Sequence, residues 1–214
     1  MNRIRVWDLP TRLVHWLLVA LLAFSWWSAE SGYMDYHRYS GYTLLGVLVF
    51  RLYWGFFGSA TARFTQFVKG PRAILEYIRG GSASGHNTAG HNPLGALSVI
   101  ALLMLLCAQV TLGLFAVDVD GLESGPLSYL VSFDVGRSCA KIHETLFNVL
   151  MAVVVLHVIA IFFYLLFKRD NLIAPMITGD KSLPAQVPTV PVSMSLLRVT
   201  IGIVLAVATV WAIV

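Results

Sequence analysis

Four histidines lie in apolar stretches of this 214-residue sequence. His143 and His157 share residues 141–160, KIHETLFNVLMAVVVLHVIA, while His15 and His37 lie in two earlier apolar stretches. A titratable group is costly to bury in such surroundings, and imidazole nitrogens are common metal ligands. These four side chains are therefore candidate ligands of a metal or cofactor.

The composition indicates which elements must position them. Hydrophobic residues make up 57% of the chain and charged residues 12%, and the mean hydropathy is +0.75. These values indicate an integral membrane protein. A spanning helix needs about 20 mostly apolar residues. Five segments qualify, namely residues 10–29, 37–58, 94–117, 141–167 and 195–214.

We expect these segments to be helices rather than strands of a barrel, because they are long apolar runs without the period-two alternation of barrel strands. The predicted fold class is all-α: a membrane bundle of four helices plus one additional C-terminal transmembrane helix. We expect one membrane domain over residues 1–182, a proline-spaced linker over 183–194 and the last helix over 195–214, which has no histidine. In HNPLG, Asn92 is expected to cap the third helix and Pro93 to begin it.

Basic residues predict the orientation. They precede the first helix, lie between the second and third, and follow the fourth, whereas acidic residues dominate the two remaining loops. The N-terminus is therefore expected on the cytoplasmic side. The formal net charge of +4 reflects this topology and gives no reason to expect a nucleic-acid partner.

Helix geometry divides the four histidines into two layers. His143 and His157 are fourteen residues apart, which corresponds to a rise of about 21 Å and a rotation to within about 40° of the same face. They cannot ligate one metal together. His37 lies at the start of the second helix, at the same membrane depth as His143. His15 lies at the inner end of the first helix, at the same depth as His157. Arg51 falls at the inner depth.

Two imidazoles from facing helices at one depth are suited to the two axial positions of a haem. Zinc and copper also bind imidazole, but neither layer offers a nearby carboxylate or thiolate. A single intramembrane histidine is often only a hydrogen-bonding residue between helices. A haem-free scaffold or transporter is therefore the remaining alternative, although two depth-matched pairs favour haem.

Four stretches of the sequence resemble the bacterial cytochrome b561 family, which includes the cytochrome b subunits of nickel–iron hydrogenases and formate dehydrogenases. They are VWDLPTRLVHW (6–16), HRYSGYTLLGVLVFRLYWGFFG (37–58), GHNPLGALS (90–98) and the segment holding His143 and His157. The resemblance covers about residues 3–182 and implies a four-helix bundle with two b haems. Position by position, it implies His15 and His157 as ligands of the inner haem, and His37 and His143 of the outer haem.

The resemblance also implies a function. Such proteins exchange electrons between membrane quinone and a periplasmic or membrane partner, such as a hydrogenase, a dehydrogenase or a c-type cytochrome. The expected location is the bacterial inner membrane, in contact with lipid. Some single-subunit relatives oxidise superoxide and reduce quinone, so a stand-alone superoxide:quinone oxidoreductase is the alternative to an electron-transfer subunit.

Several further residues carry weaker expectations. Arg51 is expected at the haem propionates, the alternative being a guanidinium that reaches the cytoplasmic interface. Arg12 is expected either at the same propionates or as a topological anchor. His86 and His91 are expected to be solvated or capping residues, with a role at quinone or propionate as the alternative.

The remaining expectations concern packing. Gln109 and Thr111 are expected to form hydrogen bonds between helices, and Gly41, Gly46 and Gly113 to allow close approach. Cys107 and Cys139 are expected to be free. Aromatic residues including Trp26, Trp27 and Trp54 are expected at the membrane interfaces.

Overall fold

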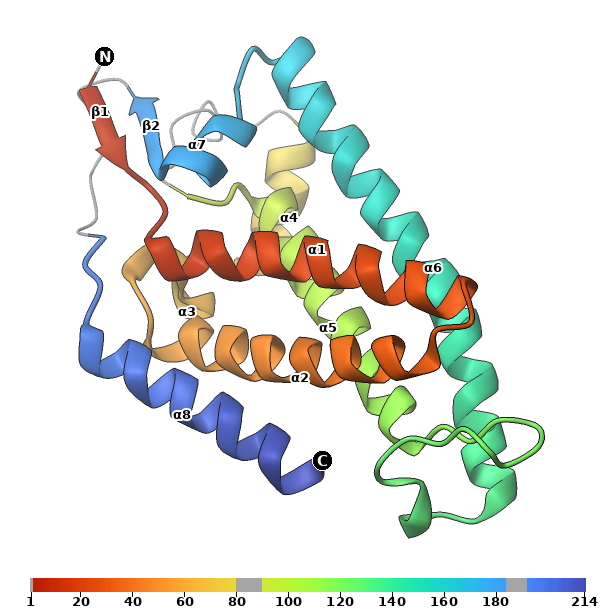
Figure 1. The fold of residues 1–214 in the computed structure, drawn as a ribbon. Coiled ribbons are helices and arrows are strands. Elements are labelled where there is room, and N and C mark those ends of the chain that lie inside the picture. The colour runs from red at the N-terminus through yellow and green to blue at the C-terminus, as the bar shows by residue number, and fades with distance from the viewer. Residues whose placement is uncertain (1, 80–89, 184–191) are drawn as a thin grey trace. The chain divides into compact units, whose positions relative to one another are not determined.

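The computed structural model describes residues 2–79, 90–183 and 192–214. Residues 80–89, which include His86, and residues 184–191 of the predicted linker lie outside the described residues. The long helices are α1 (Leu9–Glu30), α2 (Met34–Phe57), α5 (Pro93–Phe115), α6 (Phe133–Leu166) and α8 (Leu196–Ile213) (Figure 1). The short ones are α3 (Phe64–Phe67), α4 (Pro71–Ile78), α7 (Ile173–Thr178) and 3-10 turns at Ala60–Ala62 and Ser128–Leu130. The predicted all-α membrane bundle is confirmed.

Local sequence explains how α1 begins and ends. Asp8 precedes the helix, and its Oδ1 accepts a hydrogen bond from the backbone N–H of Thr11 at 2.7 Å, which satisfies one of the free donors at the helix start. At the other end Gly32 adopts φ 75°, a left-handed conformation that glycine takes without steric cost. This glycine lets the chain turn sharply from α1 into α2.

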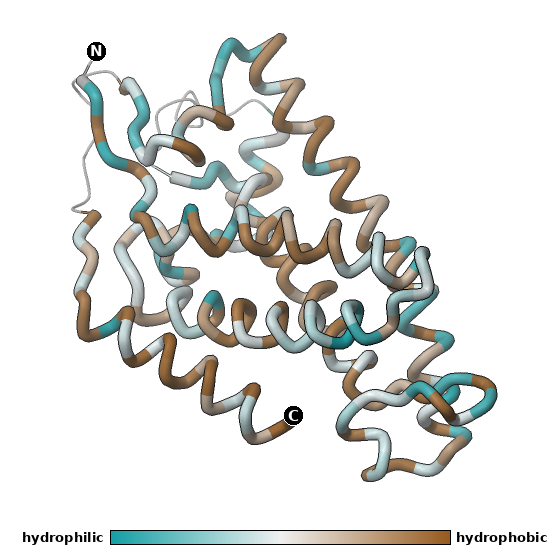
Figure 2. Tube along the Cα trace, viewed as in Figure 1, coloured by the Kyte–Doolittle hydropathy of each residue, from teal (hydrophilic) through white to brown (hydrophobic). Residues whose placement is uncertain are grey.

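Four of the described helices are long and apolar enough to cross a membrane, judged by length and composition alone: α1, α5, α6 and α8. The helix α2 has 24 residues and is long enough, but it is not among these four. Its tyrosines, its glycines and Arg51 lower its hydropathy, and Figure 2 shows it as more hydrophilic than α8. The predicted second helix is thus confirmed as a helix, while its crossing of the membrane stays a prediction.

The helix α6 is longer than its apolar segment. It begins at Phe133, eight residues before the predicted start at Lys141, and spans 34 residues. Hydropathy misses its first two turns because they contain Asp134 and Arg137. Those turns are nevertheless packed closely, since a Cβ added to Gly136 would lie 2.5 Å from Cγ2 of Val117. Packing rather than composition therefore decides where this helix begins.

A small antiparallel sheet was not predicted. Strand β1 (Asn2–Arg5) pairs with β2 (Asp180–Leu183), in register from Asn2 opposite Leu183 to Arg5 opposite Asp180. Asp180 also forms ion pairs with Arg3 and Arg5 at 3.3 and 3.4 Å. The sheet ties the N-terminal strand to the segment that follows α7.

The chain forms two compact units, each made from parts of several long helices. Unit 1 comprises residues 1–14, 51–101 and 155–202, and unit 2 comprises 15–50, 102–154 and 203–214. The added C-terminal helix contacts α2 within each unit. In unit 1, Nη1 of Arg198 donates to the carbonyl of Phe57 at 3.1 Å, and in unit 2 a Cβ on Gly46 would lie 3.3 Å from Cγ2 of Val210. Both contacts place α8 against α2.

Candidate functional site

Unit 2 brings His37 of α2 and His143 of α6 together. Their ring centres lie 6.0 Å apart, and the ring planes are nearly perpendicular, at 88°. Both side chains are half-buried. The two residues that helix geometry assigns to one layer are therefore neighbours in the folded chain.

Hydrogen bonds at Nδ1 orient both imidazoles. Nδ1 of His37 lies 2.9 Å from the carbonyl oxygen of Ser25 and 3.1 Å from its hydroxyl. Nδ1 of His143 lies 2.9 Å from the carbonyl oxygen of Gln109. A carbonyl oxygen can only accept, so each Nδ1 must carry the proton. The other nitrogen, Nε2, then keeps its lone pair for a metal ion, as in other histidine ligands whose second nitrogen donates to a carbonyl.

The separation of these rings suits a shared metal ion. Two metal–nitrogen bonds of about 2 Å, with about 1 Å from each nitrogen to its ring centre, place two opposed ring centres about 6 Å apart. Glycines flank the pair. A Cβ on Gly113 would lie 3.1 Å from Cε1 of His143, whereas a Cβ on Gly41, one turn after His37, would meet no atom within 4 Å. The observed distance and the open face beside His37 both fit a haem held between the two rings.

His157 lies in unit 1 and is oriented by a side-chain hydroxyl, which can donate or accept a hydrogen bond. Its Nδ1 is 3.1 Å from the hydroxyl of Ser98 in α5, and its side chain is half-buried. His15 lies in α1 and belongs to unit 2. The pairing of His15 with His157 therefore stays a prediction. Ser25 and Ser98, which orient two of the histidines, were not predicted as site residues.

Arg51 is buried in unit 1, with 6% of its surface exposed. Its Cζ lies 5.1 Å from the ring centre of Phe64, in cation–π geometry, and its Nη1 has no hydrogen-bond partner among the described residues. A guanidinium reaching an aqueous interface would be exposed at its tip. The burial therefore favours an internal role for Arg51 over the interfacial alternative.

Arg12 makes a contact that was not predicted. Its Nη1 donates to the carbonyl of Ile177 in α7, and its guanidinium would meet a Cβ on Gly179 at 3.3 Å. The side chain thus connects α1 to α7 within unit 1. Its predicted role at a propionate stays a prediction.

The expectation that His91 is solvated or capping is wrong. Its ring contacts those of Trp7 and Phe67 in tilted geometry, with ring centres 4.6 and 4.5 Å away, and Nδ1 is buried without a hydrogen-bond partner among the described residues. Burial lowers the pKa of His91 to about 3, with smaller contributions from Arg51 and His157. His91 is thus neutral at pH 7. The cap is instead Asn92, whose Oδ1 accepts from the N–H of Gly95 at 2.7 Å, as predicted.

Two other packing predictions need correction. Trp54 is 1% exposed and donates from Nε1 to Oδ2 of Asp8 at 2.9 Å, so it is a core residue rather than part of an interfacial belt. Gln109 bonds to His143 through its backbone oxygen, while its side-chain Oε1 has no partner in the described part of the chain. The predictions for Cys107 and Cys139, which are free, and for Gly113 are confirmed.

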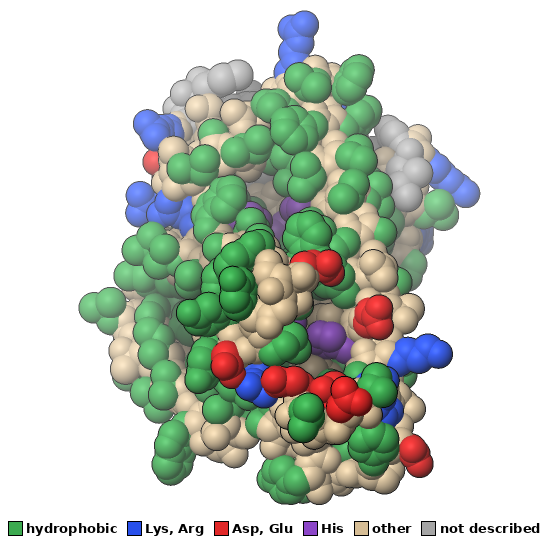
Figure 3. All heavy atoms as spheres, turned by 45° about the vertical axis from the view of Figure 1, so that its right-hand side comes forward, with side chains coloured by type: hydrophobic (Ala, Val, Ile, Leu, Met, Phe, Trp, Pro, Cys, Tyr) green, Lys and Arg blue, Asp and Glu red, His purple; other side chains and the backbone are tan. Residues whose placement is uncertain are grey.

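Charge differs strongly between the units. Unit 1 contains twelve lysines and arginines but four acidic residues, whereas unit 2 contains three basic residues and seven acidic ones. Figure 3 shows carboxylates gathered together on one part of the surface. Arg38 of unit 2 is paired with Asp35 and Glu123, each at 2.5 Å. Arg38, which follows His37 in the sequence, therefore contributes little net positive charge.

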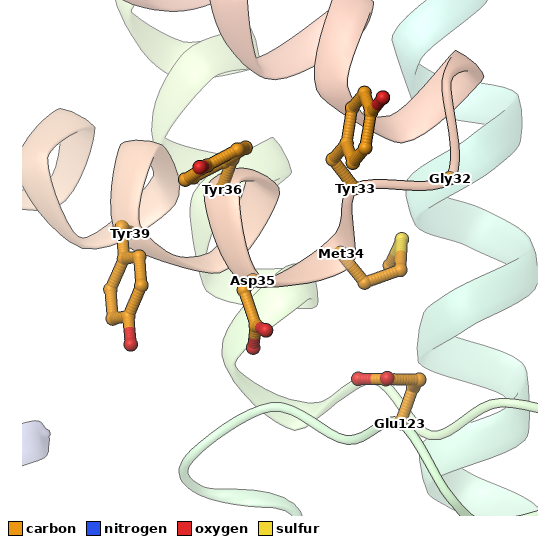
Figure 4. Close-up of a pocket in the computed structure, with 7 residues that line it drawn as sticks. All are labelled: Gly32, Tyr33, Met34, Asp35, Tyr36, Tyr39 and Glu123. Carbon is orange, nitrogen blue, oxygen red and sulfur yellow. The ribbon is translucent and has the colours of Figure 1, made fainter.

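A pocket of about 460 Å³ lies at the turn between α1 and α2 (Figure 4). Asp35 and Glu123 line it together with three tyrosines, and its described lining contains no histidine. No three His, Cys, Asp or Glu side chains of the described residues come close enough to share a metal ion. The histidine pair, rather than this pocket or a metal cluster, is therefore the candidate site.

The chain matches a known protein family. No curated protein and no solved structure matches the chain. A family model described as prokaryotic cytochrome b561 matches residues 6–179, which include the four candidate ligands His15, His37, His143 and His157 as well as Arg12 and Arg51. Such proteins are b-type cytochromes of membranes, which bind haem b and transfer electrons. This multi-pass membrane protein therefore belongs to the prokaryotic cytochrome b561 family.

Proposed function

We propose that the protein holds two b haems and relays electrons through the membrane. His37 and His143 would ligate the outer haem, and His15 and His157 the inner haem. The observation that carries this proposal is the 6.0 Å separation of the His37 and His143 rings, each oriented by a hydrogen bond at Nδ1. The spacing of His143 and His157, fourteen residues apart on α6, supports a second site in a different layer.

The role of the histidines is to ligate and orient. The chemistry supplied by bound haem is one-electron transfer between the ferric and ferrous states. With two imidazole ligands the iron would have no open position for oxygen, which would favour electron transfer. Hydrogen bonds from Nδ1 of His37 and His143 to the carbonyls of Ser25 and Gln109 orient these rings and would increase electron donation by the ligands, and the hydroxyl of Ser98 orients His157.

The proposed setting is the bacterial inner membrane, with the N-terminus in the cytoplasm. Unit 1, which is rich in lysine and arginine, would then face the cytoplasm, as the positive-inside rule requires. Electrons would pass between membrane quinone and a periplasmic or membrane partner such as a c-type cytochrome or a hydrogenase. Residues 1–182 would form the dihaem domain, with α8 added to it.

The charge of unit 2 argues against the superoxide alternative. Superoxide is an anion, and steering it to the outer haem would require a positive surface. Unit 2 carries seven acidic residues against three basic ones, and Arg38 is already paired with two carboxylates. An electron-transfer subunit therefore fits the surface better than a superoxide oxidase.

Redox spectroscopy of the purified protein tests the proposal. We expect two haem b per chain by the pyridine haemochrome assay, and reduction of both by a quinol. Superoxide should reduce the protein far more slowly than the quinol does. A haem-free protein would contradict both redox functions, and rapid quinone reduction by superoxide in the purified protein alone would favour the stand-alone enzyme.

A further inference from the structure

The segment that follows α2 in unit 1 is unusual for a loop because it is buried. Ser59 is 4% exposed and Thr61 is 8% exposed, and the hydroxyls of both lack a hydrogen-bond partner among the described residues. A buried hydroxyl without a hydrogen-bond partner is energetically unfavourable. Two of them in one short segment make this segment a candidate for binding a polar ligand.

Three buried nitrogens in unit 1 also lack a hydrogen-bond partner in the described chain: Nη1 of Arg51 and Nε of Arg63, which are donors, and Nδ1 of His91, which donates in one of its two tautomers. We call Arg51, Ser59, Thr61, Arg63 and His91 the donor cluster. Arg51 lies over Phe64, whose ring is 5.7 Å from that of Phe67, which in turn contacts His91. A Cβ at Gly90, next to His91, would be 4.0 Å from Cγ2 of Thr61. These contacts link the start of α5 to the end of α2 within unit 1.

The donor cluster has no carboxylate of its own. Unit 1 has four acidic residues. Glu76 pairs with Arg72, Asp170 with Lys181, and Asp180 with Arg3 and Arg5.

Asp8, the fourth, compensates the charge of Arg51 in part, but no hydrogen bond joins the two side chains among the described residues, and the Asp8 oxygens accept from Thr11 and Trp54. An ionised group that is buried must be compensated by a partner. The unmet hydrogen bonds and the buried cation together call for an oxyanion, and a carboxylate matches a guanidinium bidentately.

We propose that the donor cluster binds a carboxylate, and that this carboxylate is a propionate of the inner haem. The proposal rests on the proposed function, in which His157 is a ligand of the inner haem. In unit 1 His157 is hydrogen-bonded to Ser98 of α5, and His91 of the donor cluster lies just before the start of that helix. Arg51 supplies the charge, and Thr61 and Ser59 supply neutral donors. A free anion such as phosphate is the other source of the same chemistry.

Redox titration of Arg51→Gln and Thr61→Val tests the proposal, with Arg72→Gln as a matched loss of charge at an exposed position. A buried cation near a haem stabilises the ferrous form. Arg51→Gln should therefore lower the midpoint potential of the inner haem alone. Thr61→Val should lower it less, and Arg72→Gln should leave it unchanged. Equal potentials in Arg51→Gln and Arg72→Gln, at full haem content, would overturn the proposal.

Two further measurements separate the possible outcomes. If Arg51→Gln does not fold, Arg51→Lys keeps the charge but loses bidentate geometry, and it should show a smaller fall of the same potential. Thermal melts of protein made without haem test whether a free anion such as phosphate binds the donor cluster instead. Stabilisation by inorganic phosphate that depends on Arg51, together with unchanged haem potentials, would assign the cluster to a free anion and overturn the propionate. A wild-type protein without haem would instead contradict the proposed function itself.

Discussion

Units 1 and 2 differ in how fully the buried polar side chains that the structure describes are hydrogen-bonded. In unit 1 seven buried donor atoms lack a hydrogen-bond partner among the described residues: Thr11 Oγ1, Arg12 Nε, Arg51 Nη1, Ser59 Oγ, Thr61 Oγ1, Arg63 Nε and His91 Nδ1. In unit 2 the hydrogen bonds around His37 and His143 are complete at Nδ1, and the described atoms without a partner include two oxygens, Gln109 Oε1 and Asp118 Oδ1.

This difference separates two requirements of a haem site. In the proposed haem sites, iron would be held by imidazoles that the protein orients, as hydrogen bonds at Nδ1 orient His37 and His143 in unit 2. The anionic edge of the macrocycle would be held by donors without a partner in the protein, as in the donor cluster of unit 1. The excess of basic residues in unit 1 and of acidic residues in unit 2 follows the same division.

The largest expected effect comes from removing the ligands of unit 2. His37→Ala and His143→Ala should each reduce the haem content by about half, because an axial ligand is lost from the same iron. The double variant should lose no more than either single one, which the pyridine haemochrome assay would show. Additive losses would mean that the two residues serve different sites.

Crowding the same site should have a smaller effect. Gly113→Leu places a side chain where even a Cβ lies 3.1 Å from Cε1 of His143, so the imidazole must move. We expect partial loss of the outer haem on detergent purification, with Gly113→Ala closer to the native protein. Gly70→Ala is the control, since its Cβ meets no atom within 4 Å. An unchanged spectrum in Gly113→Leu would show that His143 is not confined there.

The sequence predicted the parts of this account that depend on periodicity and hydropathy. The long helices, the cap at Asn92 and the depth match of His37 with His143 follow from those patterns. It could not predict tertiary contacts between polar residues. By its sequence position Trp54 resembles an interfacial tryptophan, but in the structure it donates to Asp8. His91 likewise resembles a solvated residue, but its ring contacts Trp7 and Phe67. The first two turns of α6 are polar in composition and helical through packing.

The two units also differ in the groups that orient their imidazoles. Ser98→Ala removes the hydroxyl that lies 3.1 Å from Nδ1 of His157, whereas Ser25→Ala leaves the carbonyl of Ser25 at 2.9 Å from Nδ1 of His37. Losing the acceptor weakens electron donation by the imidazole, so Ser98→Ala should raise the inner-haem potential. Ser25→Ala should shift the outer-haem potential less. Potentiometric titration of both variants would reveal equal shifts if the backbone carbonyl did not matter.

The smallest expected effect is that of the ion pair at the surface of unit 2. Glu123→Gln removes one of the two carboxylates that bind Arg38, both partly exposed. Such pairs contribute about 0–1 kcal/mol, so the melting temperature should fall by at most about 4 °C. Thermal melts at low and high salt would check this, and a large salt-independent fall would show that Glu123 has a further role.

Low-temperature electron paramagnetic resonance of the oxidised protein tests most directly whether His37 and His143 clasp one iron. With imidazoles on both sides, the ferric signal should be low-spin and highly anisotropic, as nearly perpendicular ring planes require, and His143→Ala should remove that component while the other haem signal remains. A high-spin signal in the native protein, or a spectrum that His143→Ala leaves unchanged, would contradict the account.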